Sequence, residues 1–408
     1  MRTPRPSAAH SLLGLSLLVL TLPQQLGCKG CKSDTNLVET DPTDTGTGGT
    51  TTEEWDRDWG QWLSMGAMAD GSPAILSYDR TKGGVLLSIA DTSKEPVEWS
   101  REEVDGYVNE TGRDVGNRGL YNSMAVAADG TIWAAYQDVD LLTMRWARRD
   151  PATGLWESNT ADGGGEPDGD AGYFTSMALD STSGPVVVHH DQVKGELRLS
   201  RWNGTAFSSS VLDAGEDATD ATGATVAADV GEFASVLISD GVEYVAYYDR
   251  AAGNLKLAWG IAGNVTIEVV DDGGGSRHVE GGGDVGQWPS MMVHDGKLWI
   301  AYHDVGNQDL LLASGTPGSW TVEAVDQGEY AGADSHIFLN GTQPAILYFD
   351  GSENDMKLAT RVGEGWQLEV LAGEDGAAGF HNAAVTTLGT TWAASYDYTK
   401  RTVWFDKL

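Results

Sequence analysis

Charged side chains that could do chemistry gather in segments of the chain that are rich in glycine. One segment carries Arg113 and Arg118, and a later one carries Arg277, His278 and Glu280. Carboxyl groups that face each other across a cleft, with cations nearby, are what a glycoside hydrolase or lyase uses, so these residues are candidates for a ligand site. Acidic residues are abundant throughout the chain, so an enzyme of this kind is kept as an alternative function.

Aromatic residues form a second set of candidates. One of them recurs just before each of a series of short strand-like runs. Aromatic side chains suit the apolar faces of pyranose sugars, which makes Tyr121, Phe174 and Trp288 candidates for ligand binding. Recurring large rings are also typical of a core between repeated units, and that alternative stays open. The ring positions are Trp62, Tyr121, Phe174, Phe233, Trp288 and Phe380, with Ala333 as the exception.

Histidines and acidic loops raise the question of a metal. His190 and His303 each stand directly before a repeated aspartate, where we expect them on the same face as the loops, as further ligand-binding candidates. No HxH or HxxxH spacing supports a histidine metal site. Calcium, held by loop carboxylates, is the favoured ion, and Asp168 with Asp170 is a fragment of an oxygen-rich loop that could bind it.

A sequence unit that repeats seven times along the chain must position these candidate residues. An aspartate recurs roughly every 53 residues, each time after a short β-type run. Six and eight residues after each aspartate stand two apolar residues, which predict a strand with one buried face. The aspartates are residues Asp79, Asp138, Asp191, Asp249, Asp304, Asp350 and Asp397.

Further signals complete the unit. A glycine, often in an Asp-Gly or Asn-Gly pair, stands seven to nine residues before each aspartate and predicts a tight hairpin turn. A serine stands farther upstream in six copies, and we expect its hydroxyl to bond the aspartate while the carboxylate accepts amide hydrogens of the next turn. A residue needed once per unit is needed by the unit, so these aspartates are predicted to be structural. A fourth strand follows in most copies.

The repeat predicts an all-β fold, a seven-bladed β-propeller of four-stranded antiparallel blades over residues 53–408. The last copy stops after its third strand, and a spare strand-like segment, Glu53 to Asp58, precedes the first copy. We therefore expect an N-terminal strand to close the ring. Four consecutive junctions between units are long and three are short, so one face should carry a wall of loops over blades 2 to 5.

The unit containing Val245-Ala246-Tyr247-Tyr248-Asp249 resembles the Tyr-x-Asp repeats of secreted bacterial β-propellers, which are loosely grouped with sialidase-like Asp-box propellers. The resemblance covers nearly all of residues 53–408 and implies the fold. The Asp-box pattern Ser-x-Asp-x-Gly-x-Thr-Trp is begun at Ser77 but not completed, and the arginine triad of sialidases is not found, so sialidase activity is not expected.

The N-terminus predicts export. Arg2 and Arg5 precede an apolar run too short to span a bilayer, and residues 1–27 are typical of a signal peptide. The segment Leu26-Gly27-Cys28 resembles a bacterial lipobox, which predicts lipidation of Cys28 and anchoring to the cell envelope. Residues 28–52, rich in Thr, Asp and Gly, predict a flexible tether.

Composition narrows the partners. With 26 Lys+Arg against 60 Asp+Glu and a formal net charge of −34, the chain would repel nucleic acid. Contact with a membrane is expected only through the lipid. The leading hypothesis is a monomeric, surface-tethered, non-catalytic module that recognises a glycan or a protein through its loop-rich face. The alternatives are a propeller glycoside hydrolase or lyase, and a calcium-dependent adhesion or assembly protein.

Overall fold

The computed structural model describes residues 57–107, 116–163, 169–180, 184–220, 222–261, 264–274, 283–328, 330–373 and 376–408. All regular elements in these residues are β-strands, so none of them is a helix that could cross a membrane. Blades 1 to 4 comprise β1 (Trp59–Ala67), β2 (Pro73–Asp79), β3 (Gly84–Asp91) and β4 (Glu98–Asp105); β5 (Arg118–Val126), β6 (Ile132–Asp138), β7 (Thr143–Arg149) and β8 (Trp156–Asp162); β9 (Ala171–Asp180), β10 (Gly184–Asp191), β11 (Glu196–Trp202) and β12 (Phe207–Asp213); and β15 (Val230–Ser239), β16 (Val242–Asp249), β17 (Asn254–Ile261) and β18 (Asn264–Asp271). Blades 5 to 7 comprise β19 (Val285–His294), β20 (Lys297–Asp304), β21 (Asp309–Thr316) and β22 (Ser319–Asp326); β23 (Ala331–Asn340), β24 (Gln343–Asp350), β25 (Asp355–Val362) and β26 (Gly365–Ala372); and β27 (Phe380–Thr387), β28 (Thr390–Asp397) and β29 (Thr402–Lys407).

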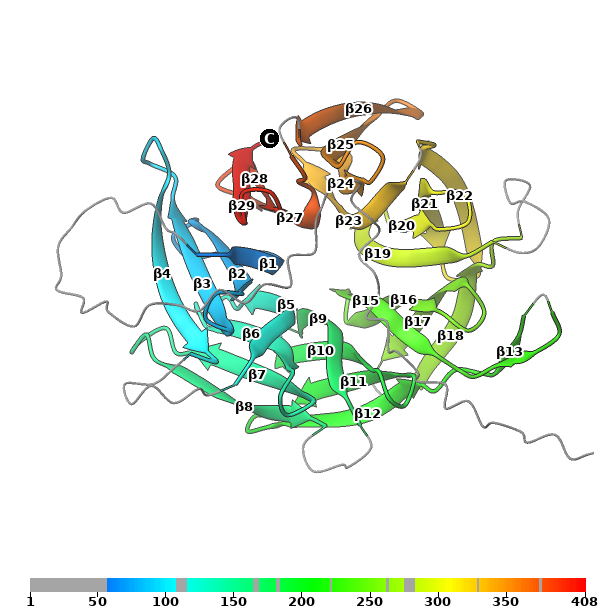
Figure 1. The fold of residues 1–408 in the computed structure, drawn as a ribbon, viewed down its shortest axis with the longest axis horizontal. Coiled ribbons are helices and arrows are strands. Elements are labelled where there is room, and N and C mark those ends of the chain that lie inside the picture. Colours follow the sequence, from blue (N-terminus) through cyan, green and yellow to red (C-terminus); the bar gives the residue numbers. More distant parts are fainter. Residues whose placement is uncertain are drawn as a thin grey trace, which may run out of the picture. The chain divides into compact units, whose positions relative to one another are not determined.

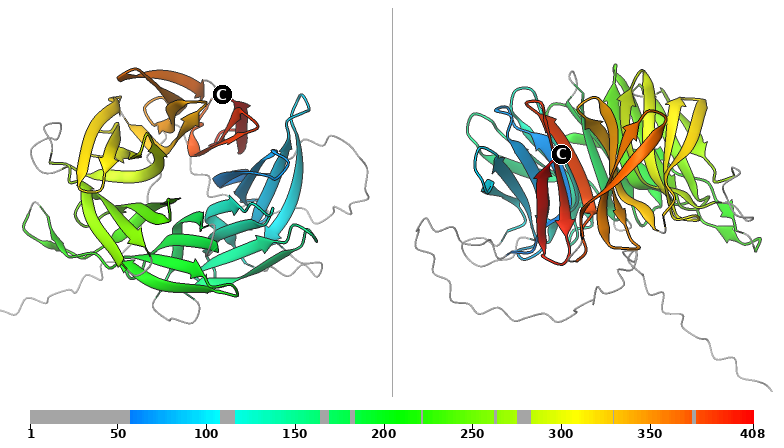
Figure 2. Two further views of the ribbon diagram at one scale, coloured as in Figure 1. Left: turned by 180° about the vertical axis from the view of Figure 1, so that it is seen from behind. Right: turned by 90° about the horizontal axis from the view of Figure 1, so that it is seen from above.

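The strands form the predicted seven-bladed propeller. Six blades are antiparallel meanders of four strands in chain order, and a small extra hairpin, β13 (Ala218–Thr219) with β14 (Thr225–Val226), lies between blades 3 and 4. Seen along the axis, the first strand of each blade is innermost and the fourth is outermost (Figure 1). Two further views show the blades from behind and from the side (Figure 2). The loops that join one blade to the next therefore share a face with the turns that follow the repeated aspartates.

The core is divided among the junctions between blades. Each junction, including that between blades 7 and 1, holds its own apolar cluster built from both neighbours. The apolar residue six positions after each aspartate is the second residue of the third strand and belongs to these clusters in most copies; Leu197, Leu255 and Leu310 are fully buried. Burial of these side chains is what holds neighbouring blades together.

Each repeated aspartate ends a second strand and anchors the turn behind it. Asp79 Oδ1 accepts hydrogen bonds from the backbone N–H groups of Thr81 (3.1 Å) and Lys82 (3.2 Å). The other six aspartates accept comparable bonds from their turns. Such bonds satisfy donors that the turn would otherwise leave unpaired.

The serine near the start of the inner strand does not play the expected part. Ser64 pairs across the sheet with Leu76, three residues before the aspartate of its blade, so the predicted bond between serine and aspartate is wrong. Three of the hydroxyls instead accept a backbone N–H group of the next blade, as Ser176 Oγ does from Val236 (3.0 Å) and Ser290 Oγ does from Ile337 (3.0 Å). Ser64 Oγ donates to Asn122 Oδ1 of the next blade (3.1 Å). These serine hydrogen bonds join one blade to the next.

A second polar link joins the outer part of one blade to the middle of the next. The aspartate that ends the outer strand accepts a hydrogen bond from a buried tyrosine two residues before the next repeated aspartate, as in Tyr136 to Asp105 (2.6 Å) and Tyr348 to Asp326 (2.7 Å). His189 takes the tyrosine's place beside Asp162. Two junctions have neither a tyrosine nor a histidine at this position: that between blades 7 and 1, where blade 1 has Ser77, and that between blades 6 and 7. Blade 6 ends its outer strand in Ala372 and blade 7 has Ser395 at the tyrosine position.

The closing strand expected from Glu53 to Asp58 begins outside the described residues. Of that segment the structure describes Arg57 and Asp58, which lie in no strand, and blade 7 as described has three strands. In the described residues β1 packs against β27 and β28, and Leu63 and Ala383 belong to one apolar cluster across the closure. Tyr396 of blade 7 also donates a hydrogen bond to Asp58 (2.7 Å).

Close contact between each inner strand and the preceding blade requires a glycine. Gly286 in β19 has φ 108°, and a Cβ placed there would lie 2.7 Å from Leu255 Cα. A glycine holds the equivalent place in all seven inner strands. No other residue can adopt this backbone conformation and approach another backbone this closely without strain. These glycines are residues Gly60, Gly119, Gly172, Gly231, Gly286, Gly332 and Gly379.

We predict that Gly286→Ala lowers the free energy of unfolding by about 3 kcal/mol or more, since the new methyl group meets backbone atoms that cannot move aside. Gly296→Ala is the control, because Gly296 also has positive φ (71°) but faces open space, and we expect a loss of only about 1 kcal/mol. Denaturant unfolding measures both. Equal losses would contradict the proposed close approach.

Candidate functional site

Seven side chains project into the axial channel because each inner strand carries a bulge. In β1, Gln61 pairs with Tyr78 and Ser64 pairs with Leu76, so the inner strand has one residue more than its partner over this stretch. The extra residue is Trp62, with φ 55°. A bulge re-aims the side chain it carries, and here all seven re-aimed residues share the left-handed conformation. They are Trp62, Tyr121, Phe174, Phe233, Trp288, Asp334 and His381, with φ between 49° and 56°.

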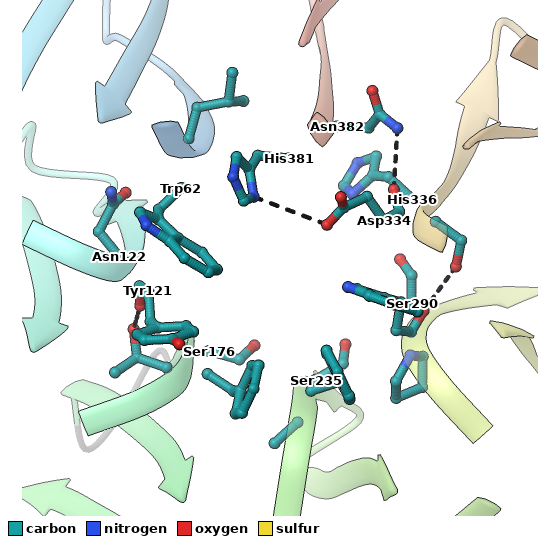
Figure 3. A pocket seen from close by; sticks show the side chains of 18 residues that line it. Trp62, Tyr121, Asn122, Ser176, Ser235, Ser290, Asp334, His336, His381 and Asn382 are labelled. Carbon is teal, nitrogen blue, oxygen red and sulfur yellow. Dashed lines mark hydrogen bonds and ion pairs between the residues drawn. The ribbon is translucent and has the colours of Figure 1, made fainter. Parts of the chain in front are cut away.

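These residues form a ring at the centre of the propeller, which we call the channel ring (Figure 3). Neighbouring aromatic members touch, with centroids 4.0 Å apart for Trp62 and Tyr121 and 4.5 Å apart for Phe233 and Trp288. His381 continues the ring, 4.4 Å from Trp62. The pocket that they line has a volume of about 240 Å³. The ring brings together Tyr121, Phe174 and Trp288, three of the residues predicted to bind a ligand.

The structure corrects the sequence alignment in blades 6 and 7. Asp334 and His381, not Ala333 and Phe380, occupy the position of the aromatic rings. Phe380 is buried against Phe349, with centroids 4.4 Å apart, and does not line the pocket. The sequence holds a signal that would have found this: the glycine of each inner strand stands two residues before the channel-ring residue in every copy.

Asp334 and His381 form the polar side of an otherwise aromatic ring. His381 Nδ1 lies 3.8 Å from Asp334 Oδ1, and Figure 3 shows the two side chains pointing toward each other. Burial raises the pKa of the Asp334 carboxyl to about 7. Burial also lowers the pKa of His381 to about 3, because the ring is removed from water. The pair therefore holds one proton on the carboxyl near pH 6 and offers a donor and an acceptor to a ligand.

A third polar residue, His336, stands where blades 1 to 5 have the serine of the inner strand. It lines the same pocket and makes a backbone hydrogen bond with Ala384 of blade 7. Burial lowers the pKa of His336 to about 4, so its imidazole is neutral at physiological pH. Because blades 6 and 7 replace residues that the other blades share, these three polar groups are not required by the repeat itself.

Three of the remaining predicted ligand-binding residues, Arg118, His190 and His303, lie outside the channel ring. The Arg118 guanidinium is engaged between blades, 2.7 Å from both Asp105 and Asp138. His190 and His303 are buried behind the ring, with ring centroids 6.5 Å from Phe174 and 5.7 Å from Trp288, respectively. Arg113, Arg277, His278 and Glu280 lie outside the described residues, so their roles stay predictions.

The metal prediction is tested only in part. Asp168 lies outside the described residues, and Asp170 accepts hydrogen bonds from Gln137 (3.2 Å) and Tyr173 (3.0 Å). Burial raises the pKa of Asp170. Within the part of the chain that the structure describes, one group has the donor set of a metal site, and it consists of His190, Asp229 and Glu232. Calcium binding stays a prediction.

We predict that Asp334→Asn stabilises the protein more at pH 8 than at pH 5. The folded carboxyl holds its proton up to pH 7, whereas the unfolded one releases it near pH 4, so its contribution to stability falls as pH rises between these values. Asparagine removes this cost, which is at most about 4 kcal/mol. Thermal melts at the two pH values measure the difference, with Asp240→Asn in an exposed turn as control. The same gain at both pH values would contradict the assigned ionisation.

Comparison with known proteins supports the fold. No protein-family model and no curated protein matches the chain. The solved structure of the polysaccharide lyase Uly1 matches with a TM-score of 0.51 and 10% identity, over 92% of this chain and 94% of that one. A prolyl endopeptidase matches with a TM-score of 0.50 and 10% identity, over 86% of this chain and 50% of that one. The Hadza microbial sialidase Hz136 gives a TM-score of 0.46 at 13% identity over 71% of this chain, which spans 63% of the sialidase. At these identities the likeness shows the β-propeller fold alone.

Proposed function

We propose that the protein is a carbohydrate-binding propeller that holds a small sugar unit at the channel ring. The observation that carries the proposal is the composition of this pocket: five aromatic rings line it together with a carboxyl and two imidazoles. A pyranose has apolar C–H faces and a rim of hydroxyl groups, and it needs both kinds of surface at once.

The size and polarity of the pocket suit such a ligand. A volume of about 240 Å³ lies below the range of about 300–1,000 Å³ for drug-sized ligands, which favours a single-ring molecule. Trp62, Phe174, Phe233 and Trp288 keep part of their surface exposed to the pocket. Asp334 and His336 of blade 6 stand next to Trp288 of blade 5 in the pocket lining and can exchange hydrogen bonds with hydroxyl groups.

Binding is favoured over cleavage by the number of carboxyl groups. Glycoside hydrolysis by the usual route needs two carboxyls roughly 5 to 9.5 Å apart. Among the described residues that line the pocket, Asp334 is the one carboxyl-bearing residue. Glu280 lies outside the described residues, so the experiment below also looks for cleaved products.

The proposed setting is the bacterial cell envelope. The support is the N-terminal sequence alone, with a signal-peptide pattern ending in Leu26-Gly27-Cys28 and a polar segment before the propeller. A lipid on Cys28 would hold the binding pocket at the surface and leave it free to reach a glycan partner. A single module of this kind needs no catalytic centre of its own.

We predict that wild-type protein, incubated with a mixed oligosaccharide pool and ultrafiltered, retains intact sugars that mass spectrometry identifies. Trp62→Ala and Trp288→Ala should weaken binding of the retained sugar about tenfold, or roughly 1.4 kcal/mol, in calorimetry. Trp320→Ala, in the outer strand β22, is the matched control and should bind as wild type does. Shorter sugars in the filtrate would make the protein an enzyme, and failure to retain any sugar would overturn the proposal.

We also predict that Cys28→Ser moves the protein from the membrane fraction to the soluble fraction of the producing bacterium, because the lipid-bearing thiol is lost. Cys31→Ser is the matched control and should stay with membranes. Metabolic labelling with a fatty acid measures the lipid directly. Equal labelling of the wild type and Cys28→Ser would contradict the assignment of the anchor.

A further inference from the structure

One layer outside the channel ring, each junction between blades has an equivalent pair of positions, which is polar except between blades 6 and 7, where Phe349 stands. The residue before the repeated aspartate faces the residue that precedes the next inner strand. In most junctions a neutral donor meets an acceptor there: Tyr248 donates to Asp284 (2.5 Å), and Gln137 donates to Asp170 (3.2 Å). These junctions are satisfied by the protein itself.

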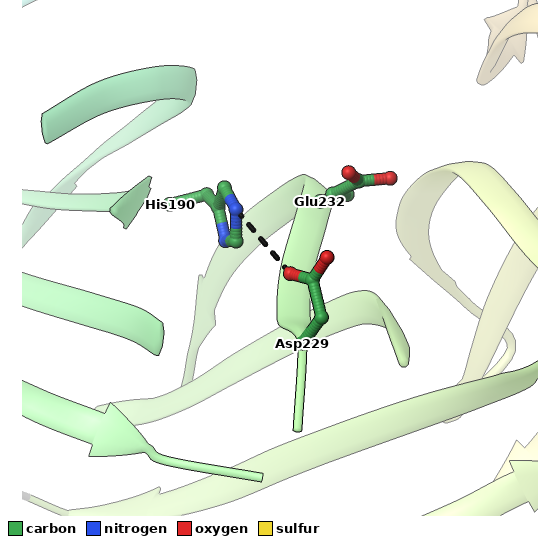
Figure 4. Close-up of side chains that lie close together, drawn as sticks. All are labelled: His190, Asp229 and Glu232. Carbon is green, nitrogen blue, oxygen red and sulfur yellow. Dashed lines mark ion pairs between the residues drawn. The ribbon is translucent and has the colours of Figure 1, made fainter. Parts of the chain in front are cut away.

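The junction between blades 3 and 4 is different, because it opposes acceptors to one another. The pair is His190 and Asp229, and Glu232 joins it two residues into β15 (Figure 4). Donor atoms of all three lie within 4.8 Å of one another. His190 Nε2 is 3.5 Å from Asp229 Oδ1, and Figure 4 shows the imidazole directed at this carboxylate.

The tautomer of His190 follows from its second nitrogen. Nδ1 lies 2.9 Å from the Val230 carbonyl oxygen, which can only accept, so Nδ1 carries the proton and Nε2 presents a lone pair. The His190 side chain is fully buried, and neither Nε2 nor Asp229 Oδ1 has a hydrogen-bond partner. A buried lone pair aimed at a carboxylate calls for a cation between them.

We propose that His190, Asp229 and Glu232 bind a divalent cation of the zinc class. One imidazole nitrogen and two carboxylates form a three-ligand set that leaves a coordination position for water or a ligand. A tetrahedral site with bonds of about 2.1 Å needs donor atoms about 3.4 Å apart. The His190 and Asp229 atoms already meet that spacing, and a Glu232 carboxylate oxygen lies within 4.8 Å of both. The nitrogen ligand selects zinc over calcium or magnesium, which prefer oxygen.

Arg250 is the competing cation at this place. Its guanidinium lies 2.9 Å from Glu232 Oε1 and 4.0 Å from Asp229 Oδ2, and its side chain is 55% exposed. Because the Arg250 side chain approaches the cluster from solvent, its guanidinium can move away from the carboxylates when a metal ion binds. It approaches the two carboxylates and leaves His190 Nε2 without a partner. The arginine therefore balances the charge of the cluster without satisfying the imidazole.

The test is calorimetric titration of the purified full chain with Zn²⁺, with Cys28 and Cys31 replaced by serine so that no thiol competes for the metal. We expect one Zn²⁺ per chain, and Ca²⁺ and Mg²⁺ should bind far more weakly. His190→Gln and Asp229→Asn should each weaken Zn²⁺ binding more than tenfold. His303→Gln is the matched control, because His303 is equally buried and also has Nδ1 on a carbonyl, that of Ala331 (2.8 Å), but belongs to no such cluster in the described residues.

The variant Arg250→Gln tests whether Arg250 and the metal ion compete for the same carboxylates. If the carboxylates are metal ligands, removal of the competing guanidinium should tighten Zn²⁺ binding severalfold and raise the melting temperature in the presence of Zn²⁺. If Arg250 is the only cation that binds these carboxylates, Arg250→Gln should be less stable than the wild type and should bind Zn²⁺ no more tightly. The proposal is overturned by that result, by no Zn²⁺ binding to the wild type, or by equal binding in His190→Gln. These readouts involve no sugar, so they stand or fall apart from the carbohydrate proposal.

Discussion

The close approach of each inner strand to the preceding blade governs the rest of the structure. Seven sheets can meet around one axis only if their inner strands come nearly into backbone contact, as Gly286 does with Leu255. A glycine at that place permits the approach, and the bulge that follows turns one side chain per blade toward the axis. The fold therefore places seven side chains around the axis, whichever residue types occupy those positions.

Because the scaffold supplies the positions, function depends on which residues fill them. Five blades place aromatic rings at the axis, and blades 6 and 7 place Asp334 and His381 there. The same contrast holds one layer outward, where most junctions pair a neutral donor with an acceptor and one junction opposes His190 to Asp229. In both layers the departures from the repeat are the chemically distinctive groups, whereas the repeated residues are used for turns and packing.

The fold could be predicted because its signals are local. Turn glycines, the repeated aspartate and the apolar residues after it all lie within one blade of about 50 residues. The site was predicted only in part, because it depends on contacts between blades. Blades 6 and 7 have the same hairpin length as blades 4 and 5, but Ser335 and Phe380 stand one residue before the equivalent positions and imitate the repeat signals there, which hid Asp334 and His381. The partners of the serines and of His190 belong to the next blade, and no spacing within one repeat reveals them.

The junction between blades 6 and 7 has a consequence for the integrity of the ring. It lacks the hydrogen bond from tyrosine to aspartate that joins four other pairs of neighbouring blades, since Ala372 and Ser395 stand at those positions. Asp334 belongs to blade 6 and His381 to blade 7, so the polar side of the pocket spans this seam. A ligand bound to both would add a link across this junction at the inner strands. Resistance of the ring to opening would then rise with the concentration of ligand.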